Sequence, residues 1–197
     1  MSVAVAARRP RMVLADLVPG ALVRDAVLVA AGAGLTGLAA QVSIHTSLSP
    51  VPFTLQTFAV LVTGAALGSV RGVTSMLLYV LAGSLGVNWF AGHTHGFAGP
   101  SAGYLVGFVI AAGVVGELAR RGNDRNVWRT ALTMVAGNVA VYVPGVVWLM
   151  HEVPSYSFGQ GMHYGVTVFL ISDLLKLAVA ALVFPAAWQL ANRFSSR

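Results

Sequence analysis

Six long runs of apolar residues, separated by short polar segments, dominate the chain. About 20 mainly apolar residues cross a lipid bilayer as a helix. The runs therefore predict six transmembrane helices, at approximately residues 23–42, 54–70, 73–87, 101–119, 128–150 and 164–190. The second and third runs are short and are separated only by a few residues around Arg71, which predicts a tight helical hairpin. We expect one all-α transmembrane domain at residues 21–192, with short cytoplasmic tails at residues 1–20 and 193–197.

The positions of the arginines predict the orientation of this bundle. With six helices, all eleven arginines fall on one side of the membrane. The loops on the other side contain neither lysine nor arginine and hold all five histidines. Since basic residues mark the cytoplasmic side, we expect a multi-pass protein of the cell membrane with both termini in the cytoplasm. The positive N-terminal region leads into a span of full length, so no cleaved signal peptide is predicted.

Composition agrees with lipid as the main solvent. Apolar residues make up 57% of the chain and charged residues 9%, whereas soluble proteins carry about 25% charged residues. The net charge of +6 does not indicate nucleic-acid binding, because the arginines sit in short clusters between apolar runs. The chain has no cysteine, which excludes disulfides and thiolate metal ligands. We expect no metal and no cofactor.

Two glycine patterns in the first apolar run favour helix packing. A GxGxxG pattern at residues 32–37 lies inside the run and lacks the acidic residue about 20 positions later that a dinucleotide site needs. Ala26, Ala30 and Gly34 form a stripe of small residues, which lets another backbone approach closely. No GxxxxGK[ST] phosphate loop occurs, so transport driven by ATP would need a separate nucleotide-binding subunit.

The strongest chemical signal is an ionisable pair in the sixth run. Lys176, the only lysine, follows Asp173 by three residues, so the two share one face of a helix. We place Lys176 about 12 residues from the outer end of that helix, roughly 18 Å deep. A charge near the middle of a bilayer costs at least about 2.5–3.5 kcal/mol, which favours a polar site for a substrate or ion. A structural ion pair that locks the bundle is the alternative.

Other candidate contacts come from the fifth run and the first outer loop. Asn138 and Tyr142 are four residues apart and share a helix face. Either a substrate contact or an interhelical hydrogen bond would explain an asparagine at that depth. The loop contains two prolines, which favour an extended backbone, and then Phe53, Thr54 and Gln56 at the mouth of the bundle.

The second outer loop is rich in glycine, aromatic residues and histidine. Trp89 and Phe90 are either anchors at the membrane interface or an apolar wall for a ligand. His93 and His95 are a weak metal signal without a third ligand nearby, so we expect them to be solvated loop residues.

Several of these segments resemble the BioY family. The resemblance covers roughly residues 20–190 and rests on Pro50-Val51-Pro52-Phe53-Thr54-Leu55-Gln56-Thr57, Gly64-x3-Gly68-x3-Gly72-x2-Ser75, Tyr79-x3-Gly83-x2-Gly86, Phe90-Ala91-Gly92, Gly99-Pro100-Ser101-x-Gly103-Tyr104-x2-Gly107, Gly137-Asn138 and Asp173-x2-Lys176. Two departures affect the second outer loop. The family more often has proline before the Val-Phe-Ala-Gly run, and residues 92–99 are shorter and richer in histidine than usual.

BioY proteins are the biotin-binding S components of energy-coupling factor transporters. The resemblance therefore implies a cavity open to the outside with high affinity for biotin. It also implies two kinds of partner, a transmembrane coupling protein (T component) and a pair of ATP-binding cassette ATPase subunits. The stripe of small residues would dock the coupling protein.

The candidate residues are chemically compatible with biotin as the ligand. Asp173 would accept hydrogen bonds from the ureido ring of biotin, Asn138 would contact the same ring, and Lys176 would donate to a ligand oxygen. Tyr104, Phe90 and Phe53 would form the apolar wall, and the end of biotin that meets Lys176 stays open.

Our leading hypothesis is a biotin-binding transport subunit without catalytic activity. The alternatives are a solitary ion-coupled carrier, an S component for another vitamin, and an intramembrane enzyme that uses Asp173 as an acid or base. The enzyme hypothesis is the weakest, because a catalytic site usually needs more converging ionisable groups.

Overall fold

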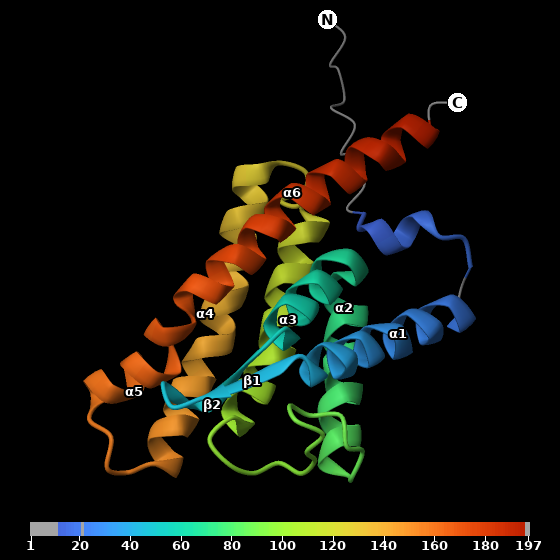
Figure 1. Cartoon of the computed structure of the whole chain (residues 1–197). Helices are drawn as coiled ribbons and strands as arrows, with labels where there is room; N and C mark the ends of the chain where they lie inside the picture. The colour runs from blue at the N-terminus through green and yellow to red at the C-terminus, as the bar shows by residue number, and fades with distance from the viewer. Residues whose placement is uncertain (1–11, 21, 196–197) are drawn as a thin grey trace, which may run out of the picture.

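The computed structural model describes residues 12–20 and 22–195 and shows a helical bundle that carries one β-hairpin (Figure 1). Its elements are η1 (Leu14–Leu17), α1 (Leu22–Gln41), β1 (Ser43–Thr46), β2 (Ser49–Thr54), α2 (Gln56–Ser84), α3 (Ala102–Arg120), α4 (Val127–Glu152), α5 (Phe158–Gly165), η2 (Thr167–Phe169) and α6 (Leu170–Ser195). Most of the expected N-terminal tail, with Arg8, Arg9 and Arg11, lies outside the described residues, as does Arg197.

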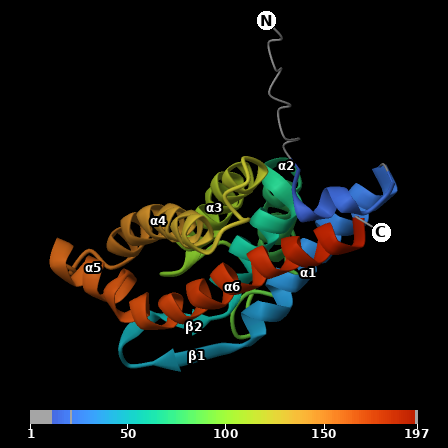
Figure 2. The same ribbon diagram turned by 90° about the horizontal axis from the view of Figure 1, so that it is seen from above.

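The helices form a layer with additional elements on one side. Helices α2, α3 and α4 lie in a row, and α1, α6 and the β-hairpin lie on the same side of that row (Figure 2). In the described residues five helical segments are long and apolar enough to cross a membrane: α1, α2, α3, α4 and the combined segment of α5 and α6. Helices suit this environment because each satisfies its own backbone hydrogen bonds in lipid. The predicted multi-pass helical architecture is therefore confirmed.

Helix α2 contains the predicted hairpin, with its reversal at Gly68. Gly68 has φ 82° and ψ 175°, a non-helical conformation that favours glycine. A Cβ on Gly72 would lie 3.1 Å from the Cα of Gly64, whereas residues eight apart in a continuous helix are separated by about 12 Å. The two halves of α2 therefore pack against each other. With α2 taken as one helix, the described residues contain five candidate spans rather than the six predicted.

The predicted sixth helix at residues 164–190 is wrong in its boundaries. The structure divides this region into α5, η2 and α6, with a break at Val166 (φ −132°, ψ −61°). A capping box formed by Ser157 and Gln160 starts α5 in a segment that the sequence assigned to a loop. Lys176 therefore lies six residues, or about 9 Å, from the start of α6 rather than roughly 18 Å.

The first outer loop is a β-hairpin, which the all-α prediction did not include. Strands β1 and β2 pair antiparallel, with Ser43 opposite Thr54 and Ile44 opposite Phe53. The two prolines of β2 keep the strand extended, as the sequence predicted. The partner strand β1 shows little alternation of apolar and polar residues, so no comparable pattern predicted the pairing.

The arginines within the described residues join several segments at one end of the bundle. Arg71 lies 2.8 Å from Asp16 of η1 and 3.1 Å from Asp25 of α1. The guanidinium of Arg125 stacks 4.3 Å above the ring of Trp188 in α6. Figure 1 shows the connection between α3 and α4 at the end opposite the loop between α2 and α3. The arrangement agrees with the prediction that the arginines share one side.

A buried carboxyl group stabilises the same end. Asp124, in the connection between α3 and α4, is fully buried and accepts a hydrogen bond from Trp188 Nε1 at 2.5 Å. Burial raises the pKa of Asp124 above its usual value, and the bond from Trp188 offsets part of that change. Asp124 therefore links the connection to α6 in the part of the molecule where the arginines gather.

Candidate ligand-binding site

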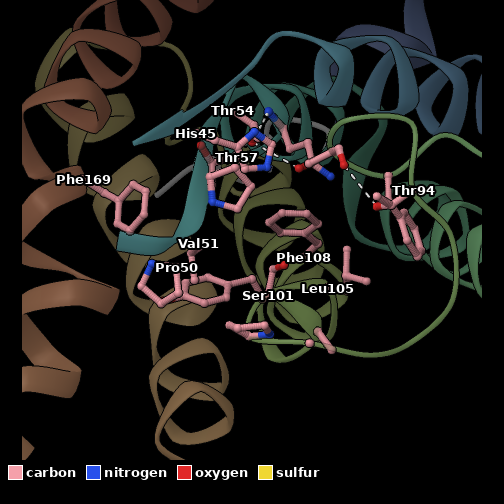
Figure 3. Close-up of a pocket in the computed structure, with 18 of the residues that line it drawn as sticks. His45, Pro50, Val51, Thr54, Thr57, Thr94, Ser101, Leu105, Phe108 and Phe169 are labelled. Carbon is pink, nitrogen blue, oxygen red and sulfur yellow. Dashed lines mark hydrogen bonds between the residues drawn. The ribbon is translucent and has the colours of Figure 1, made fainter. Parts of the chain in front are cut away.

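A cavity of about 450 Å³ opens between the β-hairpin, α2, the loop of residues 85–101, α3 and α6 (Figure 3). This volume is typical of small-molecule sites. Its polar or ionisable lining residues are His45, Thr54, Gln56, Thr57, Thr94, His95, Ser101, Tyr104, Tyr142, Asp173 and Lys176. Its apolar lining residues include Pro50, Val51, Pro52, Phe90, Leu105, Phe108 and Phe169. The cavity thus combines an apolar wall with converging polar groups.

The predicted pair of Asp173 and Lys176 lies at this cavity. Lys176 Nζ is 2.8 Å from Asp173 Oδ1 and donates a second hydrogen bond to Thr57 Oγ1 at 2.9 Å. Tyr142 donates its hydroxyl to the other oxygen of Asp173. The side chains of Asp173 and Lys176 are 6% and 13% exposed, so burial strengthens their interaction. Both prove to be interior groups that line a ligand-sized space.

A chain of hydrogen bonds explains why a threonine and a glutamine follow the prolines. Thr54 Oγ1 donates to Gln56 Oε1 at 3.1 Å, and Gln56 Nε2 donates to the hydroxyl of Tyr79 at 2.6 Å. The Tyr79 hydroxyl in turn donates to the carbonyl of Trp89 at 3.3 Å. Gln41 Nε2 donates to the same carbonyl at 3.0 Å. This network fixes the loop of residues 85–101 against α1 and α2 and so shapes one wall of the cavity.

Close helix packing positions Tyr104. Its ring lies in the cavity wall, and its hydroxyl donates to the carbonyl of Gly165 at 2.8 Å, which satisfies the end of α5. A Cβ on Gly145 of α4 would come within 2.6 Å of the Tyr104 ring. Glycine is therefore required there for the ring to fit between α3 and α4. The predicted wall residue Phe90 is also in place, buried at 5% exposure and packed edge-to-face against the ring of Tyr79.

Two predicted site residues do not line the cavity. Phe53 packs against Phe169, with ring centroids 4.6 Å apart, and Phe169 forms the wall in its place. Asn138 is half-buried on α4 and is not among the lining residues. It lies one helical turn beyond Tyr142, away from the loops, and among the described residues of α4 Tyr142 alone lines the cavity. The expected direct contact of Asn138 with a ligand is therefore not supported by this geometry.

The structure adds residues that the sequence did not single out. Thr57 had a signal, because it closes the Pro-Val-Pro segment and sits one residue after Gln56. Ser101 belongs to the Gly-Pro-Ser segment that carries the family resemblance, whereas Phe169 had no signal that distinguished it. His45 and His95 also line the cavity, although we expected His95 to be a solvated loop residue. In the described residues no group of three or more possible metal ligands occurs.

The stripe of small residues on α1 faces away from the bundle. Ala26 and Ala30 are exposed, and a Cβ on Gly34 would meet nothing within 4 Å. By contrast, the other glycines of this helix are in contact. A Cβ on Gly32 would touch Thr63 and Ser75, and one on Gly37 would touch Trp89. The structure therefore separates a packed face of α1 from an open one.

Comparison with known proteins identifies the family of this chain. Residues 8–193 match the sequence model of the BioY family. This chain belongs to the BioY family. A probable biotin transporter BioY of Pyrococcus horikoshii is 36% identical over 163 residues, which cover 81% of this chain and 93% of the relative. The biotin transporter BioY of Thermotoga maritima is 38% identical over 143 residues, covering 71% of this chain and 82% of the relative.

A solved structure shares the fold. The S-component for biotin from an ECF-type ABC transporter superimposes with a TM-score of 0.75 over 85% of this chain and 92% of that chain. The two sequences are 19% identical. This chain therefore has the fold of that S-component despite the low sequence identity.

Proposed function

We propose that this protein is the biotin-binding S component of an energy-coupling factor transporter in the cell membrane. The observation that carries the proposal is the buried pair of Asp173 and Lys176 at an apolar cavity, in a chain of the BioY family. Relatives that bear the name biotin transporter support the choice of ligand. Their names also argue against the enzyme hypothesis.

The cavity suits the chemistry of biotin. Biotin has a ureido ring that donates and accepts hydrogen bonds, an apolar thioether ring and tail, and a carboxylate. Asp173 accepts from ureido N–H groups in this proposal, while Lys176 and Thr57 donate to the ureido oxygen. Tyr104 and Phe90 cover the apolar part. The remaining lone pairs of the buried carboxylate are the reason to expect a ligand there, because a charged group in the interior is stabilised by each further hydrogen bond.

The proposed topology has six crossings, with the two halves of α2 counted separately and both termini in the cytoplasm. The basic end of the bundle supports this orientation, because Arg71 and Arg125 lie with the start of α1 and the end of α6. The cavity then opens on the outer side. ATP hydrolysis in two partner ATPase subunits drives transport through a transmembrane coupling protein.

A binding titration tests the proposal directly. We expect the purified protein in detergent to bind labelled biotin with one site per chain, and unlabelled biotin to compete far better than riboflavin or thiamine. Stronger competition by another vitamin would replace the substrate and keep the transporter class. Uptake by this chain alone in proteoliposomes, abolished by an uncoupler, would favour the solitary ion-coupled carrier instead.

Docking of the coupling protein on α1 gives a prediction of its own. Ala30→Leu is expected to reduce co-purification with the coupling protein by about tenfold, because a large side chain on the open stripe keeps the partner backbone away. Biotin binding by the isolated subunit should stay unchanged. Ala31→Leu is the matched control, since it adds the same side chain to the exposed face that already carries Val27, Leu35 and Leu38. An equal loss of co-purification in the Ala30→Leu and Ala31→Leu variants would contradict docking at this stripe.

A further inference from the structure

Two histidines, His45 and His95, line the cavity without a role in the proposed function. His45 comes from β1 and His95 from the loop of residues 85–101, and both line the cavity. Both residues are exposed, whereas Asp173 is 5% exposed. The histidines therefore mark the solvent side of the cavity, and the ionisable pair marks its interior. Figure 3 shows His45 at the edge of the cavity, by the hairpin.

The interior of the cavity offers no net charge to an anionic ligand. The negative charge of Asp173 already balances the positive charge of Lys176 at 2.8 Å, and Tyr142 and Thr57 each add one hydrogen bond to the pair. The ionisable groups that line the cavity are His45, His95, Tyr104, Tyr142, Asp173 and Lys176. Of these, only the two imidazoles can add a positive charge that no neighbouring carboxylate in the lining already balances. An anionic group of a ligand is therefore better placed at the mouth than at the interior pair.

Both rings are positioned from the same loop. His95 Nδ1 lies 2.6 Å from Asn88 Oδ1, a bond that holds the ring and leaves Nε2 as the nitrogen to meet a ligand. The ring of His45 lies beside Gly92, where a Cβ would be 3.4 Å from its Cε1. The hairpin and the loop thus bring one imidazole each to the opening. His93, in the same loop, is exposed and is not among the lining residues.

We propose that His45 and His95, in their protonated form, bind the carboxylate of the ligand at the mouth of the cavity. The inference rests on the proposed function and deepens it. The ring of the ligand then faces Asp173 and Lys176, and its acidic tail points outward. Because an imidazole carries a positive charge only when protonated, binding of an anionic ligand should be stronger at lower pH. An ordinary carboxylic acid stays ionised down to about pH 5, so the ligand keeps its negative charge above that pH.

Biotin and its methyl ester, titrated at about pH 8 and about pH 5.5, test this assignment. We expect the unmodified protein to bind biotin about tenfold more tightly at the lower pH, as a charge-assisted hydrogen bond would give. The ester lacks the charge and should bind with little dependence on pH. The double variant His45→Gln, His95→Gln should lose the dependence for biotin and bind biotin and ester alike. His93→Gln is the matched control and should behave as the unmodified protein.

Three outcomes would overturn the assignment. The first is an unchanged pH dependence in the double variant. The second is the same pH dependence for the ester as for biotin, which would assign the effect to Asp173 or Lys176. The third is a loss of pH dependence in the His93→Gln control as large as in the double variant. Biotin binding in each of these cases leaves the proposed function intact, whereas a failure of the unmodified protein to bind biotin at either pH would overturn both.

Discussion

Replacing Lys176 by methionine is expected to weaken biotin binding by about 100-fold. The change removes the donor to Thr57 and leaves the buried carboxylate of Asp173 without its counter-ion. Loss of a hydrogen bond to a charged group costs about 1.5–3 kcal/mol, and an unpaired buried charge costs more. Asp173→Asn should have an effect of similar size, because it leaves Lys176 uncompensated. Titration of the detergent-solubilised variants with labelled biotin measures both.

Two further variants separate a binding role from a structural one. Arg121→Ala removes a basic residue from an exposed ion pair with Glu117 and should leave biotin affinity unchanged within about twofold. The double variant Asp173→Asn, Lys176→Met removes the buried charges together and should regain thermal stability relative to either single variant without regaining affinity. Recovery of biotin binding in the double variant would show that the pair serves only to hold the bundle together.

The second large effect is expected at Gly107, where α3 and α4 touch through their backbones. A Cβ on Gly107 would lie 2.6 Å from the carbonyl oxygen of Val141 and 2.7 Å from its Cα. Backbone atoms cannot rotate away as side chains can, so Gly107→Ala must push the helices apart. We expect a loss of about 1–3 kcal/mol in the free energy of unfolding, and a melting temperature about 2–12 °C lower in detergent.

Gly159→Ala in α5 is the matched control for this prediction. A Cβ there would meet nothing within 4 Å, so the variant should melt at the temperature of the unmodified protein or slightly above it. Addition of biotin should raise the melting temperature of the control as it does for the unmodified protein. Equal melting temperatures for Gly107→Ala and Gly159→Ala would contradict close backbone packing between α3 and α4.

Some features of the cavity were predictable because they depend on spacing along a single helix. Asp173 and Lys176 are three residues apart, so any helix through them puts both on one face. The same argument places Tyr142 and Asn138 on one face of α4, and Tyr142 lines the cavity. Asn138 shares that spacing but lies one turn too deep. Helical spacing gives the face of a helix, and only the packing of neighbours decides how far along it the cavity extends.

Other features depend on contacts between distant segments. The break at Val166 is stabilised by Tyr104, which donates to the carbonyl of Gly165 from 61 positions away in the sequence. Ser49 likewise donates to the carbonyl of Tyr164 at 2.8 Å. No local pattern encodes these bonds, which is why an apolar run at residues 164–190 was read as one continuous helix. The depth of Lys176 was overestimated for the same reason.

The sequence by itself determined that the chain is a multi-pass helical membrane protein, that its arginines are clustered between the apolar runs, and that one ionisable pair lies within an apolar run. These properties follow from local hydropathy and from the cost of placing charge in lipid, which act on each segment separately. Only the tertiary structure decided that the hairpin, the loop of residues 85–101 and α6 enclose one cavity, and that His45 and His95 stand at its mouth. Their convergence depends on long-range hydrogen bonds and glycine contacts, which arise only when distant segments pack together.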